Sequence, residues 1–357
     1  MHITYIFHKF SLKLLLILIF LRSNLSWHLF NFLLKKAPVK TAETIYFQDL
    51  EIKENLIKTF YTIQKKNKKI INTDLDTLDK HILNKINVEG ICKLDNFKID
   101  NKIISQVNYH FDNANFFYDN HIPIPSYKKE KTEKPNGLYV SYDLSTQLNC
   151  SEILNICLNK KLISIAQEYI GSRPKLYSLN TFKTLPKETS LNNEYFTHDF
   201  HRDLDNLKWL VFFIFWTPTN ENNGGFQQLK FSHNHSNKLD SLIKSNSNYK
   251  NSKIFMQKTT PGYNKGNEYK TLFKGNIYHA YGVPGTIVGT DTFGLHRGMP
   301  VNKPRLVTWI RFGNTVSRQS LGPTNTEFRN KAILEEKNQD ILFKSKYKDI
   351  LSEVVKY

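Results

Sequence analysis

The sequence has few cysteines, a shortage of acidic residues and no long apolar run. Its three cysteines, Cys92, Cys150 and Cys157, form no C-x-x-C pair and leave one residue over. This pattern argues against a disulfide framework and against a cysteine-based zinc site. A reducing compartment fits it best, and we expect a cytoplasmic protein.

Acidic residues are outnumbered by basic ones, 32 against 50, which gives a formal net charge of +18. Such a charge would suit a nucleic acid, a membrane surface or a phosphorylated substrate. The lysines are scattered along the chain, however, and no basic segment carries the aromatic residues of a stacking platform. We therefore expect no nucleic-acid partner.

The N-terminus contains the apolar run Leu14–Leu21 behind Lys9 and Lys13. The run is far shorter than the roughly 20 residues of a membrane-spanning helix, and no small-residue cleavage site follows it. Apolar residues at broadly helical spacing across 9–34 predict an amphipathic helix that packs on the domain or makes peripheral membrane contact. Export through a signal peptide is the alternative interpretation.

The sequence divides into three segments with different predicted structure. Residues 1–78 predict a helical, Lys-rich extension, residues 79–320 a single domain, and residues 321–357 a C-terminal helical segment. Within the domain, apolar positions across 151–170 predict one helix that stops at Gly171. Short β-prone segments with Gly, Pro and Asn between them then predict a sandwich or barrel, so the fold class is mainly β with flanking helices.

The stretch FTHDFHRDLDNLKWLVFFIFWT, residues 196–217, gathers histidines and aspartates before an apolar run. His201 and Asp203 are two residues apart, so in a strand both side chains point to one face. His198, three residues from His201, is expected to face away. The best third ligand is His296, behind another β-prone segment and a Gly-rich turn. Two imidazoles and one carboxylate form the facial triad of non-haem Fe(II) oxygenases, which leaves positions open for a co-substrate and O2.

An arginine in the last β-prone segment follows the three candidate metal ligands along the chain. Arg305 lies nine residues after His296, where a guanidinium can bind the distal carboxylate of a keto acid in a bidentate manner. Arg311 lies on the same face of the segment and competes for this role. Arg297, next to His296, is a candidate for binding substrate instead.

At this point the sequence resembles the phytanoyl-CoA dioxygenase family of Fe(II)/2-oxoglutarate-dependent oxygenases, from about residue 80 to 316. The similar motifs are NVEGICKLDNF, AQEYIGSRPKLYSL, HRD, FFIFWTPTNENNGG, FSH and GTIVGTDTFGLHRG. One departure is Phe231, which stands where the family has a Gly before Ser-His. A second is the enlarged stretch between Ser-His and His296, where the polar residues 234–272 predict a long loop that we expect to lie beside the pocket as a lid.

The resemblance implies a double-stranded β-helix (jelly-roll, cupin-like) core. It implies that His201, Asp203 and His296 bind Fe(II), that Arg305 binds the co-substrate 2-oxoglutarate, and that Trp216 borders the co-substrate pocket. O2 is the second co-substrate, and succinate and CO2 are released. Because Asp203 is present, hydroxylation of a small-molecule or carrier-linked substrate is expected rather than halogenation. The alternative is a double-stranded β-helix that binds a ligand or partner without catalysis.

Overall fold

The computed structural model describes residues 58, 61–62, 71–119, 127–128, 139–186, 199–203, 208–234, 236–246, 255, 268–313 and 331–356. The predicted helix at 9–34, His198 and most of the polar stretch 234–272 lie outside these residues. In the part of the chain that is described, no helix is both long and apolar enough to cross a membrane.

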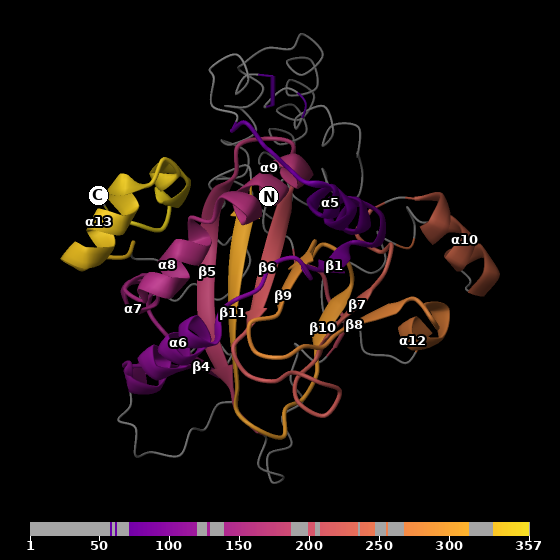
Figure 1. Cartoon of the computed structure of the whole chain (residues 1–357). Helices are drawn as coiled ribbons and strands as arrows, with labels where there is room; N and C mark the ends of the chain where they lie inside the picture. The colour runs from indigo at the N-terminus through magenta and orange to yellow at the C-terminus, as the bar shows by residue number, and fades with distance from the viewer. Residues whose placement is uncertain are drawn as a thin grey trace, which may run out of the picture.

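Two antiparallel β-sheets form the centre of the molecule (Figure 1). The order of strands in the large sheet is β1-β9-β6-β11-β5-β4-β2-β3, and in the small sheet it is β10-β7-β8. The strands of the large sheet are β1 (Ile91–Lys93), β2 (Phe117–Asp119), β3 (Tyr127–Lys128), β4 (Tyr139–Ser141), β5 (Lys175–Thr184), β6 (Trp209–Phe215), β9 (Ile287–Thr290) and β11 (Arg305–Gly313). Those of the small sheet are β7 (Phe226–Leu229), β8 (Ile277–Ala280) and β10 (His296–Gly298). This architecture confirms the predicted jelly-roll core.

Helices pack on the outside of the barrel (Figure 1). They are α5 (Thr77–Glu89), α6 (Asn101–Asn113), α7 (Leu144–Leu148), α8 (Ser151–Cys157), α9 (Lys160–Ile170), α10 (Asn237–Asn246), α12 (Glu268–Leu272), α13 (Glu336–Lys344) and the 3₁₀ helix η4 (Lys348–Leu351). Helices α5 to α9 contribute buried residues to the core on one face of the large sheet, and α13 packs on α8 and η4 beside them, whereas α10 and α12 lie next to β7 and β8. The helices therefore leave the space between the two sheets to strand side chains.

The alternation of side chains along β6 separates two hydrophobic cores. Phe212 and Ile214 belong to the helix-side core, which lies between the large sheet and the helices. Phe213 and Phe215 belong to the inter-sheet core, which lies between the two sheets and extends to α10 and α12. Every residue of β6 is buried, because the strand is covered on both faces. A strand of this kind has apolar residues at consecutive positions.

The predicted helix over 151–170 is two helices, α8 and α9, and this part of the prediction was wrong. The break lies at Leu158 and Asn159, and the Asn159 side chain accepts hydrogen bonds from the backbone N–H groups of Lys161 and Leu162. Asparagine is a preferred N-cap, so it starts a new helix inside a continuous apolar pattern. The predicted stop at Gly171 is confirmed, since this residue has a φ of 76°.

A left-handed glycine links α5 to the barrel. Gly90 ends α5 with a φ of 87° and leads directly into β1. Its carbonyl oxygen accepts hydrogen bonds from the Asp291 backbone N–H (2.9 Å) and from Gln228 Nε2 (3.1 Å). The end of an outer helix thus contacts both the small sheet and the loop that precedes β10.

Candidate metal centre

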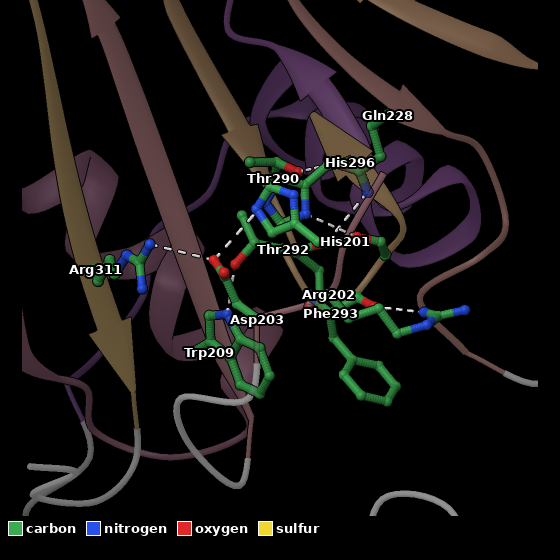
Figure 2. Close-up of polar contacts among 12 residues, drawn as sticks. His201, Arg202, Asp203, Trp209, Gln228, Thr290, Thr292, Phe293, His296 and Arg311 are labelled. Atoms are coloured by element: carbon green, nitrogen blue, oxygen red, sulfur yellow. Dashed lines mark hydrogen bonds and ion pairs between the residues drawn. The ribbon is translucent and has the colours of Figure 1, made fainter. Parts of the chain in front are cut away.

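Three side chains point toward one another beside the two sheets (Figure 2). Ligand atoms of His201, Asp203 and His296 all lie within 4.8 Å of one another. His201 and His296 form two mutual backbone hydrogen bonds of 3.0 Å, and the Asp203 backbone N–H donates to the Thr292 carbonyl at 3.0 Å. The structure therefore brings together the three residues selected from their spacing, and this group could hold a metal ion.

Backbone carbonyls orient both imidazoles. Nδ1 of His201 lies 2.9 Å from the Asp199 carbonyl oxygen, and Nδ1 of His296 lies 2.9 Å from the Gly294 carbonyl oxygen. Because a carbonyl only accepts, Nδ1 carries the proton in each neutral ring. The lone pair is then on Nε2, and His296 Nε2 lies 3.8 Å from Asp203 Oδ2.

The surroundings of Asp203 and His296 favour the protonation states that bind a cation. Burial lowers the pKa of His296 to about 3, with a further contribution from His201, so this imidazole is neutral near pH 7. Burial acts to raise the pKa of Asp203, but the Arg311 guanidinium outweighs it and holds this pKa below its usual value. A carboxylate and neutral imidazoles are the forms that coordinate metals.

Arg311 reaches the candidate ligand Asp203 from β11. Its Nη2 atom lies 3.2 Å from Asp203 Oδ2 (Figure 2). Its guanidinium lies 4.2 Å from the centre of the Trp309 ring. Sequence reasoning placed Arg311 on the same strand face as Arg305 but did not predict its contact with the carboxylate. The pairing depends on how β11 and the segment before β6 meet in space, which spacing along the chain does not give.

Arg305 lies at the opposite end of β11 from Arg311. Its side chain is 6% exposed, and its Nη2 atom donates to Thr184 Oγ1 at 3.3 Å. A Cβ atom at Gly224 would lie only 2.8 Å from Arg305 Nη1, so the glycine, which precedes β7, leaves room for the guanidinium. Arg305 therefore extends from the large sheet toward the small sheet.

Two predicted residues lie away from the ligands. Trp216 packs in the helix-side core, and its Nε1 donates to Thr308 Oγ1 at 2.8 Å. This position does not support the expectation that Trp216 borders the co-substrate, because the candidate ligand His296 stacks on Phe226 of the inter-sheet core. Arg297 follows His296 in a strand and so faces the other way; its Nε donates to Gln227 Oε1 at 2.9 Å. We therefore place neither side chain in the metal centre.

The loop before His296 is held by residues that sequence reasoning did not select. Asp291 accepts hydrogen bonds from the Tyr169 hydroxyl of α9 (2.5 Å) and from the Phe293 backbone N–H (2.9 Å). Trp209 Nε1 donates to Thr292 Oγ1 at 2.9 Å. The sequence signal for Asp291 and Thr292 was the Asp-Thr pair in GTDTFGLHRG, which was interpreted only as part of a motif similar to that of the family.

No protein-family profile matches the sequence, and no curated protein shows significant similarity to it. Several crystal structures are similar to the fold at low identity. AviO1 from Streptomyces viridochromogenes Tue57 is 12% identical, with a TM-score of 0.41 over 69% of this chain and 98% of its own.

Two further similar structures carry a description of their chemistry. The non-heme alpha ketoglutarate dependent epimerase SnoN from nogalamycin biosynthesis is 10% identical, with a TM-score of 0.43 over 66% of this chain and 83% of its own. HygX from Streptomyces hygroscopicus, crystallised with nickel and 2-oxoglutarate, is 10% identical, with a TM-score of 0.41 over 68% of this chain and 88% of its own. At this level of similarity, function does not transfer from those proteins to this chain.

Proposed function

We propose that this chain is a non-haem Fe(II)/2-oxoglutarate-dependent oxygenase that hydroxylates a small-molecule or carrier-linked substrate. The observation that carries the proposal is the convergence of His201, Asp203 and His296, with ligand atoms within 4.8 Å of one another. Two imidazoles and one carboxylate are the protein ligands of the facial triad in this class of iron enzyme.

The three side chains offer nitrogen and oxygen donor atoms that suit Fe(II), and their contacts favour the forms that can coordinate it. Carbonyl contacts at Nδ1 leave Nε2 of His201 and His296 as the donor atoms, and the lowered pKa of Asp203 keeps its carboxylate ionised. Hydrogen bonds of this sort to a ligand's other nitrogen fix the ring and raise its affinity for metal. We infer that these three residues would hold the iron.

Arg305 is the proposed partner of the distal carboxylate of 2-oxoglutarate. It is buried, donates to the Thr184 hydroxyl, and lies beside Gly224 between the sheets. A guanidinium binds a carboxylate strongly through paired, charge-assisted hydrogen bonds. Arg311 is the competing residue, but it already contacts Asp203, so its position suits the metal end of the pocket better than the far end.

When iron and 2-oxoglutarate are bound, they would supply the oxidising chemistry, with 2-oxoglutarate converted to succinate and CO2 as O2 is consumed. The residues of the chain bind, orient and exclude water. Phe226 stacks on the His296 ring with 5.4 Å between ring centres, and Phe213 packs against Phe226 at 4.8 Å. This aromatic wall keeps the region between the sheets dry beside the ligands, which strengthens electrostatic interactions there.

Hydroxylation is the proposed outcome, because Asp203 is retained as the carboxylate ligand that halogenating relatives of the resembled family lack. Among the similar structures, SnoN is described as an epimerase and SnoK as a carbocyclase. Product analysis must therefore separate hydroxylation from these other oxidations: a hydroxylated product gains one oxygen atom in mass, whereas an epimer gains none.

The test is anaerobic addition of Fe(II) and 2-oxoglutarate to the purified protein. We expect a weak visible charge-transfer band in the wild type and no band in His201→Ala. A folded, metal-loaded wild type without the band would contradict the proposed co-substrate and favour a binding protein without catalysis.

A further inference from the structure

The residue between the first two candidate ligands is buried and points away from them. Arg202 lies between His201 and Asp203, and only 9% of its surface is exposed. Side chains alternate along an extended segment, and Figure 2 shows Arg202 on the opposite side of the backbone from Asp203. A buried guanidinium is costly unless its N–H groups are hydrogen-bonded, so its contacts bear on its role.

Arg202 donates to two backbone carbonyls that come from different parts of the chain. Its Nη1 atom lies 2.6 Å from the Ser232 carbonyl oxygen and 2.5 Å from the Phe293 carbonyl oxygen. The guanidinium also lies 5.2 Å from the centre of the Phe293 ring. One terminal nitrogen therefore joins the turn after β7 to the loop before β10.

Both acceptors belong to segments that place His296. Phe293 is followed by Gly294, whose carbonyl oxygen orients the His296 ring through Nδ1. Ser232 contacts the same loop a second time, because the Leu295 backbone N–H donates to Ser232 Oγ at 2.8 Å. Arg202 thus connects the segment that carries His201 and Asp203 to the backbone immediately before the third ligand.

We propose that Arg202 is a positioning residue that sets the affinity of the His201, Asp203 and His296 site for a divalent cation. The inference rests on the proposed metal site. By holding the Phe293 carbonyl, Arg202 keeps the neighbouring Gly294 carbonyl where it orients the His296 imidazole toward the other ligands. Residues that orient metal ligands in this way change metal affinity by about 10- to 100-fold when they are replaced.

A purely structural role predicts a different result. An arginine that only stabilises the fold would lower the melting temperature when replaced and leave the metal affinity of the folded protein unchanged. Arg173, in the connection between α9 and β5, offers a matched control, because its guanidinium binds the Asp349 carboxylate of η4 at 2.6 Å and 2.8 Å.

The experiment titrates metal-free protein with Co(II) and records its d–d absorption, alongside thermal unfolding. Arg202→Met is expected to weaken Co(II) binding by about 10- to 100-fold and to alter the absorption band. Arg202→Lys, which keeps the charge and one donor, is expected to recover part of the affinity. Arg173→Met is expected to lower the melting temperature and leave the Co(II) affinity as in the wild type.

Two outcomes would overturn the inference while leaving the proposed function intact. In the first, folded Arg202→Met binds Co(II) as tightly as the wild type. In the second, Arg202→Lys fails to fold, which would make the arginine a requirement of the fold itself; if only Arg202→Met is unfolded, the affinity of Arg202→Lys decides. A wild type that binds no Co(II) would instead remove the proposed metal site.

Discussion

At the scale of single residues, the two arginines of β11 are expected to affect different binding events, Arg305 the binding of 2-oxoglutarate and Arg311 the binding of metal. Arg305 and Arg311 are six positions apart, which is about 20 Å along a strand, and only Arg311 is seen to contact Asp203. We predict that Arg305→Met raises the Kd of 2-oxoglutarate by roughly 30-fold, since a hydrogen-bonded charge contributes about 2 kcal/mol. Metal affinity should stay unchanged. Calorimetric titration of the metal-free protein with Co(II) measures the metal affinity, and titration of the metal-loaded protein with 2-oxoglutarate measures the Kd.

Arg311→Met is the comparison for that measurement. It removes the cation next to Asp203, so its expected main effect is on the metal, with a smaller loss of 2-oxoglutarate affinity than in Arg305→Met. If the larger loss is found in Arg311→Met, the assignment of the two arginines must be exchanged.

The convergence of the three candidate ligands could be predicted from the sequence, but their surroundings could not. The spacing of His201 and Asp203 predicts a shared face, and the structure places them beside His296. The carbonyls that orient the rings and the contact of Arg311 arise from segments that meet only in the folded chain. Trp216 shows the limit of a carried-over role, since it directly follows β6, continues the alternation of that strand and packs in the helix-side core.

At the scale of elements, the turn after β7 holds a residue in a conformation that usually needs glycine. Phe231 has a φ of 68°, and its ring is buried in the inter-sheet core. A glycine would adopt this conformation without strain, whereas this chain carries a large side chain here. A left-handed conformation costs a residue with a Cβ about 1 to 2 kcal/mol, which the burial of the ring offsets.

This strain predicts an unusual order of stability between two variants. Phe231→Ala and Phe231→Gly should both be less stable than the wild type by about 3 kcal/mol, because each removes a buried ring. Phe231→Gly should nevertheless be more stable than Phe231→Ala by roughly 0.5 to 1 kcal/mol, since only glycine relieves the strain. Urea unfolding of the metal-free variants measures the difference; an alanine variant equal to or better than the glycine variant would show that the turn is unstrained.

The end of α5 allows a second comparison, in which backbone and packing effects separate. Gly90 has a φ of 87°, and a Cβ there would lie 2.7 Å from His233 Nδ1. Gly275 has a φ of 77° with open space around it. Gly275→Ala should lose about 1 kcal/mol from the backbone alone, and Gly90→Ala should lose clearly more. Equal melting temperatures for the two variants would contradict the close packing of α5 on the barrel.

Element boundaries were predictable where a local residue marks them. Gly171 ends a helix at the predicted stop, because left-handed glycine is a C-terminal signal within the sequence itself. The break between α8 and α9 was missed, because apolar spacing continues across Asn159. Strand pairing was also beyond prediction, since β1 pairs with β9 about 200 residues later along the chain.

At the scale of the whole molecule, the three thiols are enclosed. Burial raises the pKa of Cys92 to about 11 and that of Cys150 to about 12, and it also raises the pKa of Cys157. Because the thiolate is the reactive form, we predict that iodoacetamide at pH 8 labels the native protein slowly and labels all three cysteines in denaturant. Mass spectrometry counts the labels. Rapid labelling of any of the three before unfolding would show that its surroundings open in solution.

The position of β11 in the large sheet bears on how the protein is made in the cell. This strand lies between β5 and β6, yet it is synthesised after both and after every other described strand. At typical rates of translation, on the order of ten seconds separate β6 from β11 at the ribosome. During that interval β5 and β6 have unpaired edges, which invite aggregation and favour chaperone binding. Arg305 and Arg311 arrive with the strand that closes the barrel, so the nascent chain has neither guanidinium in place until closure.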